Sequence, residues 1–487
     1  MPTVQTRLGA IEGVEHPGAV SFLGIPYAAP PLGERRWLPP APPTSWSGTL
    51  DARKHPNRAF QIPFPEELAP PGGIPGELSE DMLYLNVHTP GADGERRPVM
   101  FYIHGGGYTV GSANDFDPWA FAAANDIVVI CINYRLGMFG FLDLSRFGPE
   151  YAGSANLGFQ DQIAALRWAR DNVADYGGDP DNVTLCGCSA GGGSIMALLS
   201  APAARGLFHR AIAMSPLEVA PAPPDVVTPS APAMNMSEED FLAHMRSLSA
   251  EQLFEFQTMA GGGGPGVDGT ILAAGLEEAI RTSVNPVPLL TGCTLAEGPF
   301  LTQGIQSAMG DDPNVLLAIE AAFTTNIGGG DAGRYVPFLE SVTAGGTPEQ
   351  RMDRVWLDAF RSTAVRAAQA LAARGDDAWL YTFAVPTDHE FGPTHGGDVP
   401  FAFGGIDTRA EGEMYAFYRN NAANRRLASL WSRTFARFTR TGDPTWEEMP
   451  DWPTYSPERR ACLVLGSEAE VVDNPDGEAA LAAYGLV

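Results

Sequence analysis

The stretch that decides the fold is Val183-Thr184-Leu185-Cys186-Gly187-Cys188-Ser189-Ala190-Gly191-Gly192, which is followed by the apolar run Ser194 to Leu199. The first part is typical of a buried strand and the last part of a buried helix. A Gly-x-Ser-x-Gly between them predicts a sharp turn, because residues without bulk let the backbone fold tightly and expose the serine hydroxyl. Ser189 is therefore the candidate nucleophile, and an ordinary structural turn is the alternative.

Similar apolar runs recur on both sides of this stretch, and amphipathic helical patterns separate them. The runs are Leu83 to Val87, Val99 to Ile103, Ile127 to Ile132, Pro288 to Thr291, Trp379 to Phe383 and Cys462 to Leu465. Continuous rather than alternating hydrophobicity indicates central strands that are covered on both faces. Strands that alternate with helices predict an α/β fold with a large, mostly parallel mixed sheet flanked by helices.

The composition is that of a globular protein with a large core. The chain has 487 residues, of which 44% are hydrophobic and 18% charged. We expect one elaborated domain over residues 1–487, with a helical excursion at about 316–374 that helps to wall the site. The formal net charge of -27 repels phosphate backbones and anionic lipids, so nucleic acid and membrane are not expected partners.

Three features predict a cytoplasmic location. The five cysteines cannot all pair, and we expect them to be reduced thiols. The N-terminus has no basic segment followed by an apolar run, and residues 4–14 already alternate like a hairpin around Gly9. The longest apolar run, Ile127 to Ile132, is far shorter than the roughly 20 residues that cross a bilayer. The expected location is the cytoplasm.

A second motif is His104-Gly105-Gly106-Gly107-Tyr108, directly after the run Val99 to Ile103. A serine that attacks a carbonyl needs backbone N–H donors aimed at the developing oxyanion, and glycines approach such an atom closely. Gly106 and Gly107, together with Ala190 after the nucleophile, are the expected donors. A plain glycine turn is the alternative.

The serine also needs a histidine to accept its proton and an acid to orient that histidine. The elbow resembles that of α/β-hydrolases, in which the chain order is serine, acid, histidine. The histidines that follow Ser189 are His209, His244, His389 and His395. His395 is preferred because it lies in a glycine-rich loop after a strand, whereas His389 stands between two charged residues. Glu297, which follows the run Pro288 to Thr291, is the expected acid.

Taken together, these stretches resemble the type B carboxylesterase/lipase family, which also contains the cholinesterases and the non-catalytic neuroligin-like adhesion domains. The resemblance covers nearly the whole chain. Further matching segments are Phe22 to Ala28, Pro31 to Trp37, Ser79 to Val87, Asn133 to Leu142, Asn156 to Gln162 and Gly177 to Pro180. The resemblance implies an α/β-hydrolase fold, a Ser189–Glu297–His395 triad, and an oxyanion hole at Gly106, Gly107 and Ala190. It also implies two structural ion pairs, Arg36 with Glu80 and Arg135 with Asp161.

Three positions depart from the family pattern. Met82 and Ala59 stand where many members have a disulfide, and Cys188 replaces the usual glutamate before the nucleophile. Nothing in residues 60–78 reproduces the family's choline-binding loop, so cholinesterase activity is not implied. We interpret Cys188 as a buried small residue rather than a catalytic thiol.

The sequence therefore predicts a serine carboxylesterase that acts through an acyl-enzyme on a small-molecule ester. No metal and no organic cofactor are expected, and the chain is expected to be a monomer or homodimer. The same mechanism on amides, carbamates or toxin and polymer esters is one alternative, and a non-catalytic binding module is another. Candidate pocket walls, each of which is equally interpretable as plain core, are Tyr108, Leu217, Phe300 and Phe403.

Overall fold

The structure is a computed structural model of the chain. It describes residues 1–62, 74–219, 230–231, 234–260, 263–282, 284–310, 312–404 and 418–487. The chain forms two compact units. The first comprises residues 1–209 and 219–285, and the second comprises residues 210–218 and 286–487. The single domain expected from the sequence stays a prediction.

In the described part of the first unit, six strands belong to the large mixed sheet. In spatial order they are β3 (Val14–His16), β4 (Ala19–Pro26), β6 (Tyr84–Thr89), β8 (Val128–Ile132), β7 (Arg97–Ile103) and β9 (Gly178–Cys188). The pairs from β3 to β8 are antiparallel, whereas β7 is parallel to both β8 and β9. Every residue of β8 is buried, as its continuous apolar pattern predicts.

The expected N-terminal hairpin is present in this unit. Strands β1 (Thr3–Thr6) and β2 (Gly9–Glu12) pair antiparallel, with Thr6 opposite Gly9, and β5 (Thr49–Asp51) adds a parallel third strand. The helices of the unit are α1 (Trp119–Asn125), α2 (Gly137–Gly140), α3 (Leu157–Asn172), α4 (Ala190–Ser200), α6 (Glu238–Ser247), α7 (Ala250–Ala260) and α8 (Leu276–Arg281).

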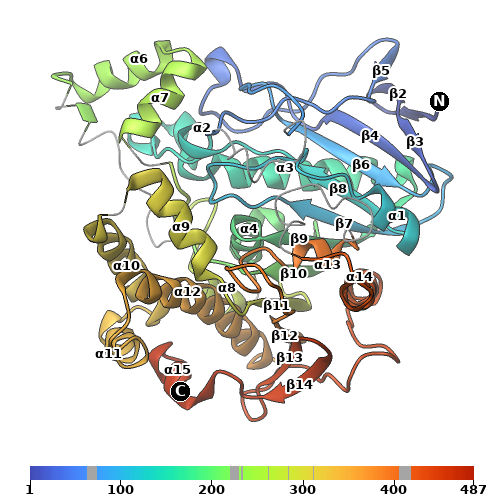
Figure 1. The fold of residues 1–487 in the computed structure, drawn as a ribbon. Helices are drawn as coiled ribbons and strands as arrows, with labels where there is room; N and C mark the ends of the chain where they lie inside the picture. The colour runs from blue at the N-terminus through green and yellow to red at the C-terminus, as the bar shows by residue number, and fades with distance from the viewer. Residues whose placement is uncertain are drawn as a thin grey trace. The chain divides into compact units, whose positions relative to one another are not determined.

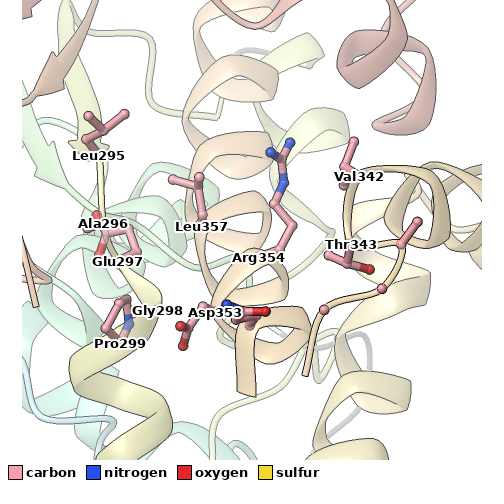
Figure 2. Close-up of a pocket in the computed structure, with 14 residues that line it drawn as sticks. Leu295, Ala296, Glu297, Gly298, Pro299, Val342, Thr343, Asp353, Arg354 and Leu357 are labelled. Carbon is pink, nitrogen blue, oxygen red and sulfur yellow. The ribbon is translucent and has the colours of Figure 1, made fainter. Parts of the chain in front are cut away.

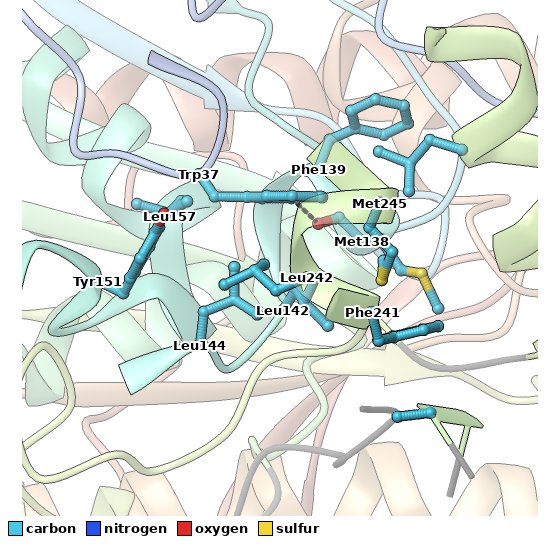
Figure 3. Close-up of a cluster of buried hydrophobic side chains, with 12 residues drawn as sticks. Trp37, Met138, Phe139, Leu142, Leu144, Tyr151, Leu157, Phe241, Leu242 and Met245 are labelled. Atoms are coloured by element: carbon cyan, nitrogen blue, oxygen red, sulfur yellow. Dashed lines mark hydrogen bonds between the residues drawn. The ribbon is translucent and has the colours of Figure 1, made fainter. Parts of the chain in front are cut away.

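A buried apolar cluster joins α6 and α7 to the segment around α2 (Figure 3). At its centre the indole of Trp37 is fully buried, and its Nε1 donates a hydrogen bond to the carbonyl oxygen of Met138 at 2.9 Å. Phe241 and Met245 of α6 pack into the same cluster. Burial of such side chains contributes about 1.5–3 kcal/mol each, which holds this helical pair on the unit.

The described residues of the second unit form five strands. In spatial order they are β10 (Arg210–Met214), β11 (Leu289–Thr294), β12 (Ala378–Phe383), β13 (Ala461–Leu465) and β14 (Ala469–Asp473). All neighbouring pairs are parallel except β13 with β14. The helices of the unit are α9 (Gly298–Met309), α10 (Pro313–Ile327), α11 (Ala332–Val342), α12 (Pro348–Ala372), α13 (Val399–Ala402), α14 (Ala422–Thr441) and α15 (Gly477–Ala483).

The region expected as a helical excursion, about 316–374, holds α10, α11 and α12, which lie together in Figure 1. The C-terminal half of α12 also covers the strands of the unit. The guanidinium of Arg361 donates to the carbonyl oxygen of Tyr381 on β12 at 3.0 Å and forms an ion pair with Asp476. This helix is therefore part of the layered core as well as a neighbour of the candidate site.

Candidate active site

Ser189 lies at the turn between β9 and α4, as the sequence predicts. Its φ of 59° is in the left-handed region, which a non-glycine residue adopts only when the surrounding structure enforces it. A Cβ on Gly187 would lie 2.7 Å from the carbonyl carbon of Gly191, and a Cβ on Gly191 would lie 2.1 Å from the carbonyl oxygen of Ile103. The turn therefore requires glycine at both positions.

The loop after β7 lies against this turn. A Cβ on Gly105 would be 2.7 Å from the carbonyl oxygen of Cys188, and Gly106 and Gly107 have φ values of 98° and 61°. Across the described ranges, no acceptor takes the N–H groups of Gly106, Gly107 or Ala190. Ala190 is the first residue of α4, where the helix dipole adds partial positive charge. The three N–H groups have the properties that an oxyanion hole needs.

His104 holds this loop in place. Its ring stacks on Tyr134 with centroids 4.4 Å apart, and its Nδ1 is 2.9 Å from the carbonyl oxygen of Gly105. Burial lowers the pKa of His104 to about 4, so the ring is neutral at physiological pH. His104 is therefore a structural histidine of the loop.

The expected acid and base are paired within the second unit. Nδ1 of His395 is hydrogen-bonded to Oε2 of Glu297, and both side chains are buried. The other carboxylate oxygen of Glu297, Oε1, accepts hydrogen bonds from Ser215 Oγ and from the N–H of Thr294, each at 2.6 Å. The carboxylate is therefore fixed at both oxygens, and it fixes the orientation of the imidazole.

The ends of neighbouring parallel strands bring these groups together. Ser215 directly follows β10, Glu297 follows β11, and the loop of His395 follows β12. A hydrogen bond from the N–H of Ala296 to the carbonyl oxygen of Pro393, at 3.1 Å, ties the last two loops together. The ring of Phe360 on α12 stacks on His395 with centroids 4.7 Å apart, which restricts the imidazole further.

Ser215 was not found by sequence reasoning. Its φ of 44° is in the left-handed region, so its position at the acid is enforced by its surroundings. The sequence feature that could have indicated Ser215 is its position directly after an apolar run. Side chains at the carboxyl ends of parallel strands lie at one edge of the sheet.

The competing base, His389, is not paired with Glu297. It is half-buried, its Nδ1 accepts a hydrogen bond from the N–H of Phe391 at 3.3 Å, and its neighbours Asp388 and Glu390 are exposed. The geometry of the second unit thus favours His395.

The four candidate pocket walls occupy different surroundings. Tyr108 packs edge-on against Phe141, with ring centroids 5.3 Å apart, in the first unit. Phe300, on α9, packs edge-on against Phe391 at 6.0 Å in the second unit. Leu217 is half-buried after β10, and Phe403 is buried at the end of α13. Their role as substrate walls stays a prediction.

A cavity of about 570 Å³ adjoins the acid within the second unit. Figure 2 shows the segment Leu295 to Pro299 on one side of it, Asp353, Arg354 and Leu357 of α12 in the middle, and Val342 and Thr343 on the other side. Gly298 closes against α12, because a Cβ there would lie 2.1 Å from the Cα of Asp353. The start of α9, directly after the acid, is therefore held by a close contact with α12 on this side.

The described residues also bear on metal and membrane binding. Among the described residues, no group of three or more His, Cys, Asp and Glu side chains is placed to hold a metal ion. Nor does the described part of the chain contain a helix with the length and apolarity that a bilayer crossing requires.

Comparisons with known proteins agree with one another. Residues 1–482 match the model of the carboxylesterase family. The chain is 33% identical to the para-nitrobenzyl esterase of Bacillus subtilis, over 98% of this chain and 97% of that protein. It is also 33% identical to the phenmedipham hydrolase of Pseudarthrobacter oxydans, over 97% of this chain and 96% of that protein.

Solved structures give the same result. A carboxylesterase of Geobacillus stearothermophilus, 33% identical, covers 99% of both chains with a TM-score of 0.83. A thermophilic para-nitrobenzyl esterase, 30% identical, also covers 99% of both chains with a TM-score of 0.85. These neighbours have the α/β-hydrolase fold, which confirms the fold class expected from the sequence. The chain belongs to the carboxylesterase family and is a carboxylic ester hydrolase.

Proposed function

We propose that the ester is cleaved through an acyl-enzyme on Ser189. His395 takes the proton of the Ser189 hydroxyl as the hydroxyl attacks the carbonyl carbon, and it then gives the proton to the leaving alcohol. A water molecule, activated by His395 in the same way, then attacks the acyl-enzyme, which releases the carboxylic acid and restores the Ser189 hydroxyl. The observation that carries the proposal is the bond from Nδ1 of His395 to Glu297, since an imidazole held in this way offers Nε2 to the serine.

In the same proposal the N–H groups of Gly106, Gly107 and Ala190 hold the negative oxygen that forms during attack. Support comes from their lack of any acceptor in the described ranges and from the tight packing of Gly105 on Cys188. A preorganised donor of this kind is worth about 10²- to 10³-fold in kcat. No metal or organic cofactor takes part.

Replacement and labelling of the nucleophile test its assignment. Ser189→Ala should lower kcat/KM by at least about 10⁴-fold without loss of the folded state. An organophosphate should label Ser189, and mass spectrometry should find the adduct there. An adduct on Cys188 or on another serine would overturn the assignment.

The two histidines of the loop after β12 provide a matched pair. His395→Ala should lower activity about as much as Ser189→Ala, because members of a triad act as a unit. His389→Ala should leave activity within about threefold of the wild type, since its ring contacts Phe391 and not the acid. The reverse result would move the general base to His389.

We propose small neutral esters as the substrate class. Amides, carbamates and toxin or polymer esters remain alternative substrates for the same triad, because the leaving-group preference depends on the pocket walls. A panel of p-nitrophenyl esters with rising acyl length, assayed beside branched, aromatic and amide substrates, decides between them. A non-catalytic binding module is disfavoured by the paired Glu297 and His395.

We also propose a cytoplasmic enzyme that is a monomer or homodimer. Support for a reducing compartment comes from the five cysteines, none of which is in a disulfide and all of which are buried. Thiol titration of freshly isolated protein and sedimentation velocity test the two parts of this proposal. Disulfides in the native protein, or a larger assembly, would contradict it.

A further inference from the structure

A second buried carboxylate accompanies the Glu297–His395 pair, and the reaction as proposed does not use it. Asp398 is fully buried, and its Oδ2 accepts a hydrogen bond from Tyr381 Oη at 2.6 Å. Its Oδ1 receives no hydrogen bond from any residue in the described ranges. A buried carboxylate with an unsatisfied oxygen is destabilising, so its presence here calls for a functional explanation.

The chain around Asp398 folds back toward the base. The N–H of Gly397 donates to the carbonyl oxygen of Thr394 at 2.9 Å, and the N–H of Val399 donates to that of Gly396 at 3.1 Å. These turns place the Asp398 carboxylate within electrostatic reach of both His395 and Glu297. Two acidic side chains therefore act on one imidazole.

Tyr381 is held rigidly as the partner of Asp398. It lies on β12 opposite Gly292 of β11, and a Cβ on Gly292 would come within 2.6 Å of the tyrosine ring. On α14, Trp431 packs edge-on against that ring with centroids 4.9 Å apart. Because Gly292 has no side chain, the Tyr381 ring fits beside it, and in this position the Tyr381 hydroxyl reaches Asp398.

Among the described residues, the titratable groups that face Asp398 come from four elements. They are Tyr381 of β12, Glu297 after β11, His395 of its own loop, and Tyr418 ahead of α14. Burial raises the pKa of Asp398 to about 6, the Tyr381 hydrogen bond opposes this rise, and the charge of Glu297 adds to it. Asp398 therefore changes charge in the pH range in which an imidazole also titrates.

We propose that the ionised carboxylate of Asp398 stabilises the imidazolium form of His395 during the reaction, and that Tyr381 keeps this carboxylate ionised at neutral pH. Asp398 is a positioning residue in this scheme, because it acts through His395 and does not touch the ester. The inference rests on the proposed role of His395 as general base. Its physical basis is the Coulomb attraction between buried charges, which water screens only weakly.

The variant Asp398→Asn tests whether the charge of Asp398 stabilises the imidazolium form of His395. Loss of the negative charge makes the imidazolium less stable, so the acid limb of the kcat/KM profile should move to lower pH by about one unit. The plateau of kcat should fall about tenfold for the same reason, with KM nearly unchanged. A purely structural aspartate would lower the melting temperature and the amount of active enzyme but would leave the acid limb in place, and that result overturns the proposal.

The variant Tyr381→Phe tests the role of Tyr381. It should move the acid limb of the kcat/KM profile in the direction opposite to Asp398→Asn. Without its hydrogen bond the Asp398 carboxylate ionises at higher pH, so the acid limb should move upward while the alkaline plateau recovers the wild-type value. Tyr418→Phe is the matched control, because its buried hydroxyl has no hydrogen-bond partner among the described residues. A downward shift in Tyr381→Phe, or an equal shift in Tyr418→Phe, would refute the role of Tyr381.

One comparison of variants separates a failure of the proposed function from a failure of the Asp398 inference. If His395→Ala keeps the wild-type activity and pH profile, the proposed function is wrong and the Asp398 inference is wrong with it. If His395→Ala is inactive while Asp398→Asn keeps the wild-type acid limb, only the Asp398 inference is wrong.

Discussion

Arg135 and Asp161 form a buried, two-pronged ion pair in the first unit. Nε and Nη2 of Arg135 donate to the two oxygens of Asp161 at 2.8 and 2.7 Å, and the backbone N–H of Arg135 adds a third bond at 3.1 Å. Nη1 of Arg135 donates to the carbonyl oxygen of Leu38 at 2.9 Å. The pair thereby joins the segment after β8 to α3 and to the N-terminal region. It is one of the two ion pairs that the family resemblance implies, and the other, Arg36 with Glu80, is also formed.

Breaking this pair should be strongly destabilising. Asp161→Asn leaves the buried guanidinium of Arg135 without a counter-charge, and we expect a loss of about 3–5 kcal/mol in the free energy of unfolding. Denaturant titration measures it. Glu448→Gln, which breaks the exposed pair with Arg433, is the control and should cost less than about 1 kcal/mol. Equal losses in the two variants would contradict the account.

His104 should make stability depend on pH. Its pKa is lowered from 6.5 to about 4 in the folded chain, so between these values the unfolded chain binds more protons. The contribution of His104 to the free energy of unfolding is therefore fully present above about pH 6.5. It decreases by up to about 3 kcal/mol as the pH falls toward 4. The slope of the unfolding free energy against pH should be smaller in His104→Asn than in the wild type, and an unchanged slope would refute this assignment.

Gly298 should be intolerant of a side chain because of its contact with α12. Gly298→Ala places a Cβ 2.1 Å from the Cα of Asp353, and we expect a loss of about 1–3 kcal/mol in stability and a lower kcat through displacement of Glu297. Gly304→Ala, on the same helix, meets nothing within 4 Å and should be neutral or stabilising by up to about 1 kcal/mol. Thermal unfolding and ester kinetics on both variants check the contrast.

Cys188 should affect the preference for cationic esters. Its side chain is buried directly before the nucleophile and carries no charge, whereas a carboxylate there would stabilise a cationic alcohol group at short range. The net charge of -27 acts only over about 8 Å at physiological salt. Choline esters should therefore be poorer substrates than neutral isosteric esters, and Cys188→Glu should narrow the difference in kcat/KM. A wild-type preference for the cationic ester that survives high salt would contradict this.

The sequence predicted the parts of the molecule that depend on local pattern. The strand, turn and helix around Ser189 follow from its glycines and its apolar flanks, and the hairpin around Gly9 follows from alternation. Glu297 was expected as the acid from its place after a strand, and the structure pairs it with His395 rather than His389.

Ser215 and Asp398 were not predicted because their contacts join segments distant in the chain. The bond from Ser215 to Glu297 spans 82 residues, and no local spacing encodes it. The placement of Asp398 depends on Tyr381 and on the missing side chain of Gly292 on the next strand. Such a cluster can be recognised only when the strand order is known, because its members come from the ends of different strands.

The burial of all five thiols has a practical consequence for biophysical work on this enzyme. Thiol-reactive dyes attack exposed thiolates, so the native chain should give little background labelling. Val342 is 45% exposed and lines the cavity beside Glu297, so Val342→Cys offers a fluorophore attachment point there without removal of any native cysteine. A probe at that position would report on movement between α11 and α12 while the enzyme turns over.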